Sequence, residues 1–432
     1  MYDHFTTTEL KNGIKIIQLP DTHINSFTIL ICLMVGATYE DNSKRGISHL
    51  VEHMVFKGCK STPDSTDLLK YIENMGGDMN AFTDSDVTGY HIKCMYKYQS
   101  KITQVLLDMV FNSIYNKKEL EHERNVVIEE LRKERDETED YVDILEDQRM
   151  FKGSELELSI GGTEQTVKKI SYNDLMEFVR RYYVSNNCVI FLGGKIQQAT
   201  INLIRKFQIP KNSNASDIAL YSYKTINYQR TINTRVQIVT KDVDQVVFSI
   251  AFPILDVSSS VRTILSMIAT YFAGNMSSLL FLLLREKMGL VYSISCDIDC
   301  TYHRGKIGFS GGCKSQNLLK CIEVILAELE KFKKKNIAEE ELTRVKNFLE
   351  SNILMEQENT FDVLENAMYS LMYRKQISST QQKITRIKKV TVDNMRSHGN
   401  QIFDLSQCYV TVAGKYTAKQ RDQLKKRVIK YL

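Results

Sequence analysis

The chain has 432 residues, which is too long for one ordinary hydrophobic core and indicates two or more domains. Hydrophobic residues make up 43% and charged residues 25% of the sequence, the balance of a folded protein and not of a disordered one. The net charge of +5 is too small for this length to indicate a nucleic-acid-binding protein.

Cysteine usage and apolar runs bear on the compartment. The nine cysteines are odd in number and scattered, with no C-x-x-C pair, so we expect reduced thiols and no thiolate metal site. The N-terminus lacks the basic start and apolar core of a signal peptide, and the longest apolar runs are far shorter than a membrane span. The sequence therefore predicts a soluble protein of a reducing compartment. We expect this compartment to be the cytoplasm, and we expect no membrane partner.

The first half of the chain alternates strand-like and helical patterns. Apolar, β-branched runs predict strands at 13–19, 27–35 and 87–95. The stripe over 102–110 has the spacing of an amphipathic helix. Strands in hairpin-like succession with helices between them indicate an α+β fold, in which a mostly antiparallel sheet is covered on one face by helices.

The stretch from Gly46 to Gly58 contains the pattern H-x-x-E-H. On a helix, His49 and His53 are four residues apart and project from one face, close enough to share a single ion. Glu52 lies beside the same face but is too near His53 in sequence to be a natural third ligand. A glutamate there suits a general base that acts on a water held by a metal.

A catalytic zinc site usually has three protein ligands, so a third must come from elsewhere in the chain. The helical segment 119–130 carries Glu123 and Glu130 two turns apart on one stripe. We expect Glu130 to be the third ligand and Glu123 to accept a hydrogen bond from a ligating imidazole. Glu129 is the competing ligand, but it points about 100° around the helix from Glu130. Two histidines packed in a core are the structural alternative, which the carboxylate pair disfavours.

Similar segments recur at an offset of 220 residues. The helix start at 167–171 leads to an apolar strand that ends in Gly194-Lys195, and 387–391 leads in the same way to Gly414-Lys415. The polar stretch after Pro210 reads as a linker. The sequence thus predicts two homologous domains, 1–210 with the metal motif and 220–432 without it, joined by a linker at 211–219.

These residues resemble the pitrilysin-type inverzincins, which include insulin-degrading enzyme and the mitochondrial processing peptidases. The inverted H-x-x-E-H is the signature of that family. The resemblance covers the whole chain, and the segments that carry it are 35–40, 46–58, 77–83, 123–130 and 284–292. One departure is Cys59, where the family often has threonine.

The resemblance implies a role for each matching residue. His49, His53 and Glu130 would hold one Zn2+ per chain, Glu52 would be the general base, and Glu123 would be the supporting carboxylate. Asn80, Ala81 and Phe82 match an edge strand that accepts a peptide substrate by β-augmentation. Arg285 and Tyr292 match a pair that the second domain directs toward the substrate.

The second half lacks the metal-associated residues. Aligning the repeats puts Ser278, Phe281 and Leu282 at the places of His49, Glu52 and His53, and puts Val345 and Asn352 at those of Glu123 and Glu130. A purely structural role would give little reason for such a one-sided loss. We therefore expect the second half to be a partner domain that contacts substrate.

The sequence predicts a zinc metalloendopeptidase that acts on unfolded peptides or flexible protein termini, working as a homodimer or a related clamshell assembly. Two alternatives remain open, a processing-peptidase subunit that needs a different partner and a non-catalytic scaffold. The acidic run at 134–140 either is a solvated helix end or selects basic residues in a peptide.

Overall fold

The structure, a computed structural model, describes residues 4–211, 231–255, 257–301 and 304–432. The chain forms two compact units, each taken mainly from one half of the sequence. Unit 1 comprises Met1–Arg132, Leu158–Ser222 and Leu354–Thr380, and unit 2 comprises Lys133–Glu157, Tyr223–Ile353 and Gln381–Leu432. The predicted linker at 211–219 lies outside the described residues, apart from Lys211.

Unit 1 is built on a six-stranded sheet in the order β1-β2-β6-β3-β5-β4. Neighbouring strands are antiparallel except β2 and β6, which run parallel. Strand β4 forms one edge of the sheet and, among the strands in the described ranges, pairs only with β5. The strands are β1 (Thr6–Glu9), β2 (Lys15–Pro20), β3 (Ser26–Leu33), β4 (Asp78–Thr83), β5 (Thr88–Met95) and β6 (Cys188–Gly194).

One face of this sheet packs against helices of the same half of the chain. Ile29, Ile31 and Ile92 of the sheet share a core with Leu50 of α1 and Leu106 of α3, all fully buried. The helices from this half are α1 (Ile47–Val55), α2 (Ser65–Glu73), α3 (Gln99–Phe111), α4 (Lys117–Asp136), α6 (Glu164–Lys169), α7 (Tyr172–Tyr182) and α8 (Gln198–Lys206).

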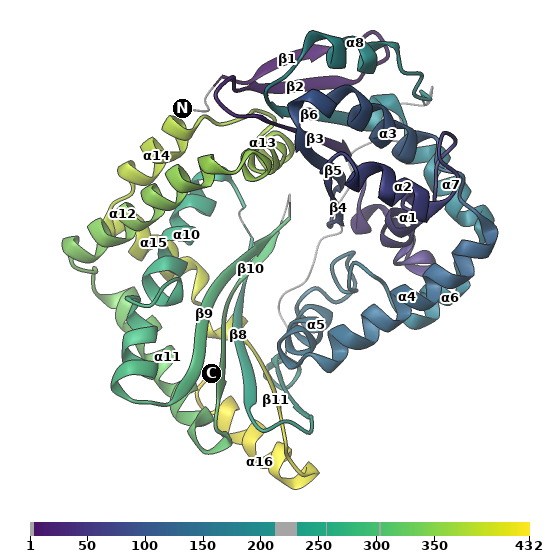
Figure 1. Ribbon diagram of the computed structural model, residues 1–432. Coiled ribbons are helices and arrows are strands. Elements are labelled where there is room, and N and C mark those ends of the chain that lie inside the picture. Colours follow the sequence, from purple (N-terminus) through teal and green to yellow (C-terminus); the bar gives the residue numbers. More distant parts are fainter. Residues whose placement is uncertain (1–3, 212–230, 256, 302–303) are drawn as a thin grey trace. The chain divides into compact units, whose positions relative to one another are not determined.

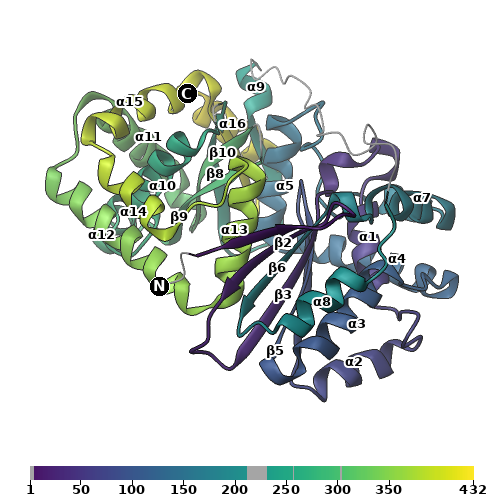
Figure 2. The same cartoon turned by 90° about the horizontal axis from the view of Figure 1, so that it is seen from above.

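The other face of the same sheet is covered by a helix from far along the chain. Helix α13 (Thr360–Arg374) places Leu364 and Met368 against Leu30, Cys32 and Phe191. Figure 2 shows α13 on one side of strands β2, β6 and β3, and α3 and α8 on the other side. The sheet is thus covered on both faces, and not on one as the local pattern predicts.

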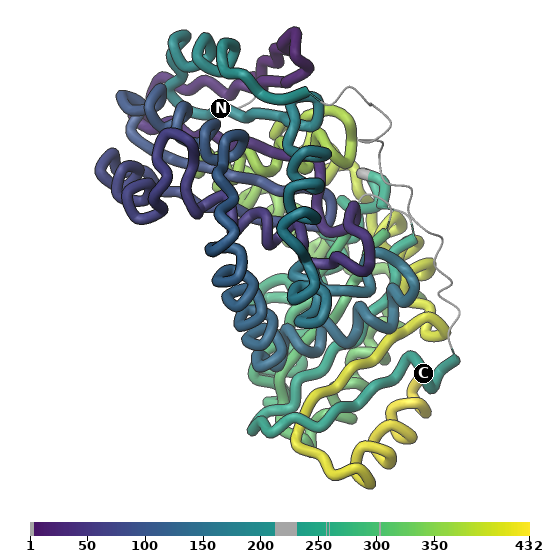
Figure 3. The backbone as a smooth tube through the Cα atoms, turned by 90° about the vertical axis from the view of Figure 1, so that its right-hand side faces the viewer, coloured from purple at the N-terminus to yellow at the C-terminus, as the bar shows by residue number. Residues whose placement is uncertain are grey.

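Unit 2 repeats the sheet with five strands in the order β7-β11-β8-β10-β9. Strands β7 and β11 are parallel and lie side by side in Figure 3, and the remaining neighbours are antiparallel. The strands are β7 (Val236–Thr240), β8 (Val246–Ile254), β9 (Val291–Cys300), β10 (Gly305–Cys313) and β11 (Tyr409–Gly414).

Most helices of unit 2 share one large core with the sheet. Phe248 and Phe252 of β8 pack there with Phe272 of α10 and Leu329 of α11. The helices are α9 (Ile232–Arg235), α10 (Ser259–Ala273), α11 (Leu318–Lys334), α12 (Glu339–Met355), α14 (Thr380–Lys389), α15 (Val392–Ile402) and α16 (Ala418–Ile429). No helix in the described ranges is both long and apolar enough to cross a lipid bilayer.

The opposite face of the unit 2 sheet is covered by α5 (Thr138–Met150), a helix from the first half of the chain (Figure 1). Val142 packs with Val247 and Ala413, and Met150 with Ala251 and Tyr409. Each sheet therefore carries one helix from the opposite half of the sequence. The compact units differ in this respect from the predicted continuous domains.

The predicted α+β class, with two homologous domains of mostly antiparallel sheets covered by helices, is confirmed. The repeat also appears in the helix starts. Ser171 caps α7 and Thr391 caps α15, each through a reciprocal side-chain and backbone pair with the residue three positions on. Strands β6 and β11 then take equivalent interior positions, between β2 and β3 in the first sheet and between β7 and β8 in the second.

A buried ion cluster fixes α5 to its sheet. Lys306 of β10 lies 2.7 Å from Asp147, 3.3 Å from Glu146 and 3.8 Å from Asp143, measured from Nζ to the nearest carboxylate oxygen. Ser249 donates a hydrogen bond of 2.7 Å to Glu146. Burial raises the pKa of Asp147 to about 7, although Lys306 acts in the opposite direction.

We predict that Lys306→Met lowers the free energy of unfolding of unit 2 by about 3–5 kcal/mol at pH 8, because it leaves carboxylates without their counter-charge. Without Lys306, which acts to lower the pKa of Asp147, this carboxyl should be neutralised at a higher pH in the variant than in the unaltered chain, so the deficit should shrink as the pH falls from 8 toward 5.5. Denaturant unfolding at both pH values measures this. Lys320→Met, which removes an exposed pair with Glu323, should cost less than about 1 kcal/mol. Equal deficits for Lys306→Met at the two pH values would contradict the account.

Candidate metal centre

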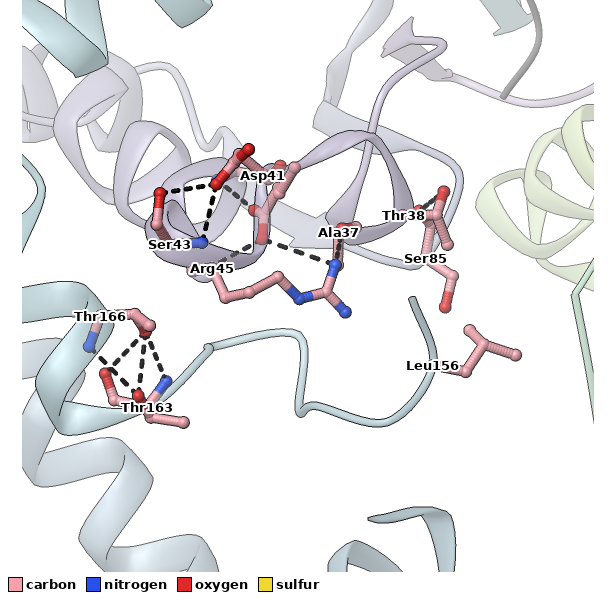
Figure 4. A network of polar contacts seen from close by, with 12 residues as sticks. Ala37, Thr38, Asp41, Ser43, Arg45, Ser85, Leu156, Thr163 and Thr166 are labelled. Carbon is pink, nitrogen blue, oxygen red and sulfur yellow. Dashed lines mark hydrogen bonds and ion pairs between the residues drawn. The ribbon is translucent and has the colours of Figure 1, made fainter. Parts of the chain in front are cut away.

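The N-terminus of α1 is fixed by a buried carboxylate. Glu40 accepts hydrogen bonds from the backbone N–H of Gly46 at 2.8 Å and of Ser48 at 2.7 Å, which satisfies two free donors of the first turn. Arg45 is 1% exposed, lies 3.9 Å from Glu40 and donates to the carbonyl of Ala37 (Figure 4). Burial raises the pKa of Glu40 to about 7, against the effect of Arg45.

Gly46 is required at the start of this helix. Its φ is +94°, and a Cβ there would lie 2.3 Å from the carbonyl oxygen of Gly161. From Gly46 onward, Ile47, Leu50 and Met54 face the core, so the opposite face of the helix carries the half-buried His49 and His53. The local sequence thus fixes where the two imidazoles stand.

Three candidate ligand atoms converge at this face. The Nε2 atoms of His49 and His53 are 3.3 Å apart, and Oε2 of Glu130 lies 3.8 Å from the first and 3.4 Å from the second. Ligands bound tetrahedrally to zinc at 2.0–2.2 Å would be about 3.3–3.6 Å apart. The spacing of these donors therefore fits a single zinc ion. No other group of three or more potential ligands occurs in the described part of the chain.

The surroundings of the two imidazoles shift their pKa values in opposite directions. Burial acts to lower the pKa of His53, but the hydrogen bond with Glu123 and the nearby carboxylates of Glu130 and Glu52 raise it above its ordinary value. Burial, assisted by the neighbouring His53, lowers the pKa of His49 to about 4, so its ring is neutral at pH 7. Nδ1 of His53 lies 3.1 Å from Glu123, which is 2% exposed. A proton on Nδ1 directed at that carboxylate leaves the lone pair of Nε2 free for a metal.

Glu130, and not Glu129, is the carboxylate that faces the two rings. Glu129 is exposed and forms an ion pair of 2.6 Å with Arg132. Glu123 and Glu130 both lie on the side of α4 that faces α1, as their two-turn spacing predicts. The structure thus brings His49, His53, Glu130 and Glu123 together as the sequence predicts.

Glu52 lies on the same face of α1 and is held by the edge strand. The hydroxyl of Thr83, the last residue of β4, donates to Oε2 of Glu52 at 2.5 Å. Burial raises the pKa of Glu52 above its ordinary value, while the contacts with Thr83 and His53 act to lower it. A carboxylate with a raised pKa next to candidate metal ligands is suited to accept and return a proton near neutral pH.

The predicted substrate strand is an edge strand. Asn80, Ala81 and Phe82 lie on β4, whose outer side pairs with no other described strand. Asn80 is exposed, and Ala81 and Phe82 are half-buried. Because β4 ends at Thr83, the edge on which a peptide could pair leads directly to Glu52.

The other two predicted substrate residues belong to unit 2. Arg285 lies in a π-helical segment, Phe281–Lys287, with its guanidinium 4.8 Å from the centre of the Phe281 ring. Tyr292 is the second residue of β9, one of the two edge strands of its sheet, and is 47% exposed. Both side chains are exposed.

Two of the residues of unit 2 that align with the metal-associated positions, Ser278 and Val345, are buried. Ser278 is fully buried and donates to the carbonyl of Asn275 at 2.6 Å, and Val345 belongs to the core. Two residues that contact the candidate site, Thr83 and Lys57, are not singled out by the sequence alone. Thr83 contacts Glu52, and Lys57 contacts Glu123. In each pair the two residues belong to different elements, so their spacing along the sequence does not predict the contact.

Comparison with known proteins fixes the family. Residues 16–164 match the family described as insulinase (peptidase family M16), and residues 169–349 match the peptidase M16 inactive domain. The chain belongs to peptidase family M16. The predicted resemblance to pitrilysin-type peptidases is thereby confirmed.

Relatives of this M16 protein span nearly all of its length. A Bacillus subtilis protein named uncharacterized zinc protease YmxG is 26% identical over 396 residues, which are 91% of this chain and 94% of that protein. The mitochondrial-processing peptidase subunit beta of Dictyostelium discoideum is 24% identical over 408 residues, 90% of this chain and 84% of that subunit. The crystal structure of a protease from Helicobacter pylori shares the fold, with a TM-score of 0.88, 21% identity, and coverage of 96% of this chain and 100% of that one.

We predict that Glu130→Gln lowers the zinc affinity of the purified chain by at least tenfold, because an anionic oxygen ligand is lost. His49→Ala should have a similar or larger effect. The matched control is Glu129→Gln on the next position of the same helix, which should bind zinc like the unaltered chain. Chelator competition measures the affinities, and a larger loss for Glu129→Gln than for Glu130→Gln would reverse the assignment.

Proposed function

We propose that this chain is a zinc-dependent endopeptidase that cleaves extended peptides, with His49, His53 and Glu130 as metal ligands and Glu52 as general base. The observation that carries the proposal is the triangle of donors at 3.3, 3.4 and 3.8 Å, with Glu52 on the same helix face. The names of the relatives, zinc protease and processing peptidase, agree with it.

Bound zinc would supply the positive charge that acidifies a neighbouring water and polarises the scissile carbonyl. Glu52 would take the proton from the attacking water and deliver it to the nitrogen of the departing amine. Thr83 fixes one oxygen of Glu52, which leaves the other free for this proton. Glu123 would keep His53 in the tautomer that a metal ligand requires.

The edge strand β4 suggests how substrate would bind. A peptide that adds to β4 would make main-chain hydrogen bonds, which hold its backbone extended and depend little on its sequence. Only unfolded peptides or flexible protein termini present such a strand. We therefore propose that the enzyme selects substrates by the extended conformation of their backbone more than by the identity of their side chains.

Arg285 and Tyr292 would complete the site from the second unit. A tyrosine hydroxyl close to the scissile carbonyl would stabilise the negative charge that develops on its oxygen. We propose that this contribution is made within a homodimer or a related clamshell assembly. The relative named subunit beta favours a second candidate, in which the chain is a processing peptidase subunit that acts with a different partner.

The test of the proposed function is digestion of a mixed pool of unstructured peptides by the purified chain, with and without a zinc chelator, read by mass spectrometry. Chelator-sensitive cleavage of many peptides would support the endopeptidase. Stoichiometric zinc without any cleavage would favour the partner-dependent subunit. Absence of both zinc and cleavage would favour a non-catalytic scaffold.

We predict that Glu52→Gln reduces kcat by a factor of about 10²–10⁴, because the amide cannot accept a proton. Zinc content should stay at one per chain, since Glu52 is not a ligand. Parallel metal analysis and peptide hydrolysis measure the two quantities. Retained turnover in a zinc-loaded variant would refute the assigned base.

We predict that Tyr292→Phe lowers kcat by about 10²-fold while zinc binding is unchanged, because one hydrogen-bond donor to the developing oxyanion is removed. Tyr431→Phe, at another exposed tyrosine of the same unit, is the matched control and should leave kcat unaltered. Steady-state kinetics on one unstructured peptide gives both values. An unaltered kcat in Tyr292→Phe would remove Tyr292 from the proposed site.

A further inference from the structure

The side chain of Lys57 lies at the rear of the candidate metal centre. Its Nζ is 2.7 Å from Oε1 of Glu123, whose other oxygen, Oε2, is 3.1 Å from Nδ1 of His53. Lys57, Glu123 and His53 thus form a continuous chain of charged and polar contacts that ends at a candidate ligand. His49 has no such support, because its Nδ1 is buried without a hydrogen-bond partner among the described residues.

The backbone holds Lys57 in place. It follows the C-terminus of α1, and its N–H donates to the carbonyl of Met54 at 3.2 Å. The next residue, Gly58, has a φ of +109°, and a Cβ there would lie 2.1 Å from the carbonyl oxygen of Pro63. Cys59 then forms a β-bridge with Ser113. Lys57 therefore lies in a turn whose backbone is held by contacts before and after it. The Lys57 side chain is only 25% exposed.

Glu123 needs this partner for geometric reasons. Its side chain is 3% exposed, and a buried carboxylate is tolerated when both oxygens are paired. The nearby His122 is 3.9 Å away and 69% exposed, so it is no substitute for Lys57. With one oxygen held by the ammonium group, the other is directed at His53, and the ring cannot turn away without losing its acceptor.

We propose that Lys57 is a positioning residue of the metal centre, which orients Glu123 so that His53 presents Nε2 to the ion. This inference rests on the proposed function, since it assumes that zinc binds at these residues. The positioning role predicts that removal of Lys57 weakens zinc binding, which is the opposite of what charge alone predicts. Removal of a nearby cation should by charge alone tighten the binding of a dication, whereas loss of a positioning contact should weaken it.

The test is the zinc affinity of the purified full-length chain, measured by competition with a chelator. Lys57→Met should weaken binding on the order of tenfold, at the low end of what loss of an outer partner of a ligand costs. Lys57→Arg, which keeps a cationic donor, should stay within about threefold of the unaltered chain. Lys60→Met removes an exposed lysine of the same loop and should change nothing.

A double variant tests whether Lys57 acts through Glu123. If it does, Lys57→Met should have little further effect on zinc affinity in a chain that already carries Glu123→Gln. Additive losses in the double variant would overturn the proposal. Lys57→Met should also lower the thermal stability of the metal-free protein, because buried Glu123 loses its counter-charge, whereas Lys57→Arg and Lys60→Met should unfold like the unaltered chain. Zinc affinity is therefore measured at a temperature at which every variant is folded.

The possible outcomes separate this inference from the proposed function. Tighter or unaltered zinc binding in Lys57→Met, with normal binding in the unaltered chain, would overturn the positioning role alone. Failure of the unaltered chain to bind zinc would overturn the proposed function together with this inference. Weaker binding in Lys57→Met that Lys57→Arg restores would support both.

Discussion

The candidate site depends on one constraint, the convergence of two imidazoles from α1 with a carboxylate from α4. The Nε2 atoms of His49 and His53 lie 3.3 Å apart with a carboxylate oxygen of Glu130 beside them, so a single cation can bind all three donors. The surrounding elements serve this convergence. Glu40 fixes the start of α1. The apolar face of α1 sets its rotation, and the buried residues Leu120, Val127 and Leu131 set that of α4.

The family and the fold place this site in a duplicated architecture. Apart from β1, the two sheets have the same strand order and strand directions, yet the group of candidate metal ligands occurs in one of the units, within the part of the chain that the structure describes. Ser278, which aligns with His49 when the two repeats of the sequence are matched, is buried and donates a hydrogen bond to the carbonyl of Asn275. The two units thus share one fold. In the function we propose, unit 1 binds the metal and unit 2 contacts the substrate.

Much of the site could be predicted from the sequence because its geometry is local. The spacing of His49, Glu52 and His53 is a property of one helix, and that of Glu123 and Glu130 is a property of another. The repeat was visible because both halves kept the same helix start and strand end. The contact of Thr83 with Glu52 and that of Lys57 with Glu123 depend on how separate elements pack, so the sequence pattern did not reveal them. The same holds for α13 and α5, whose apolar faces show that they are buried but not on which sheet.

The most direct test of the central claim is anomalous diffraction at the zinc edge from crystals of the zinc-loaded chain. The account predicts a single peak about 2.0–2.2 Å from Nε2 of His49, Nε2 of His53 and a carboxylate oxygen of Glu130. A peak at other residues, or one from which the Glu130 carboxylate is turned away, would contradict it.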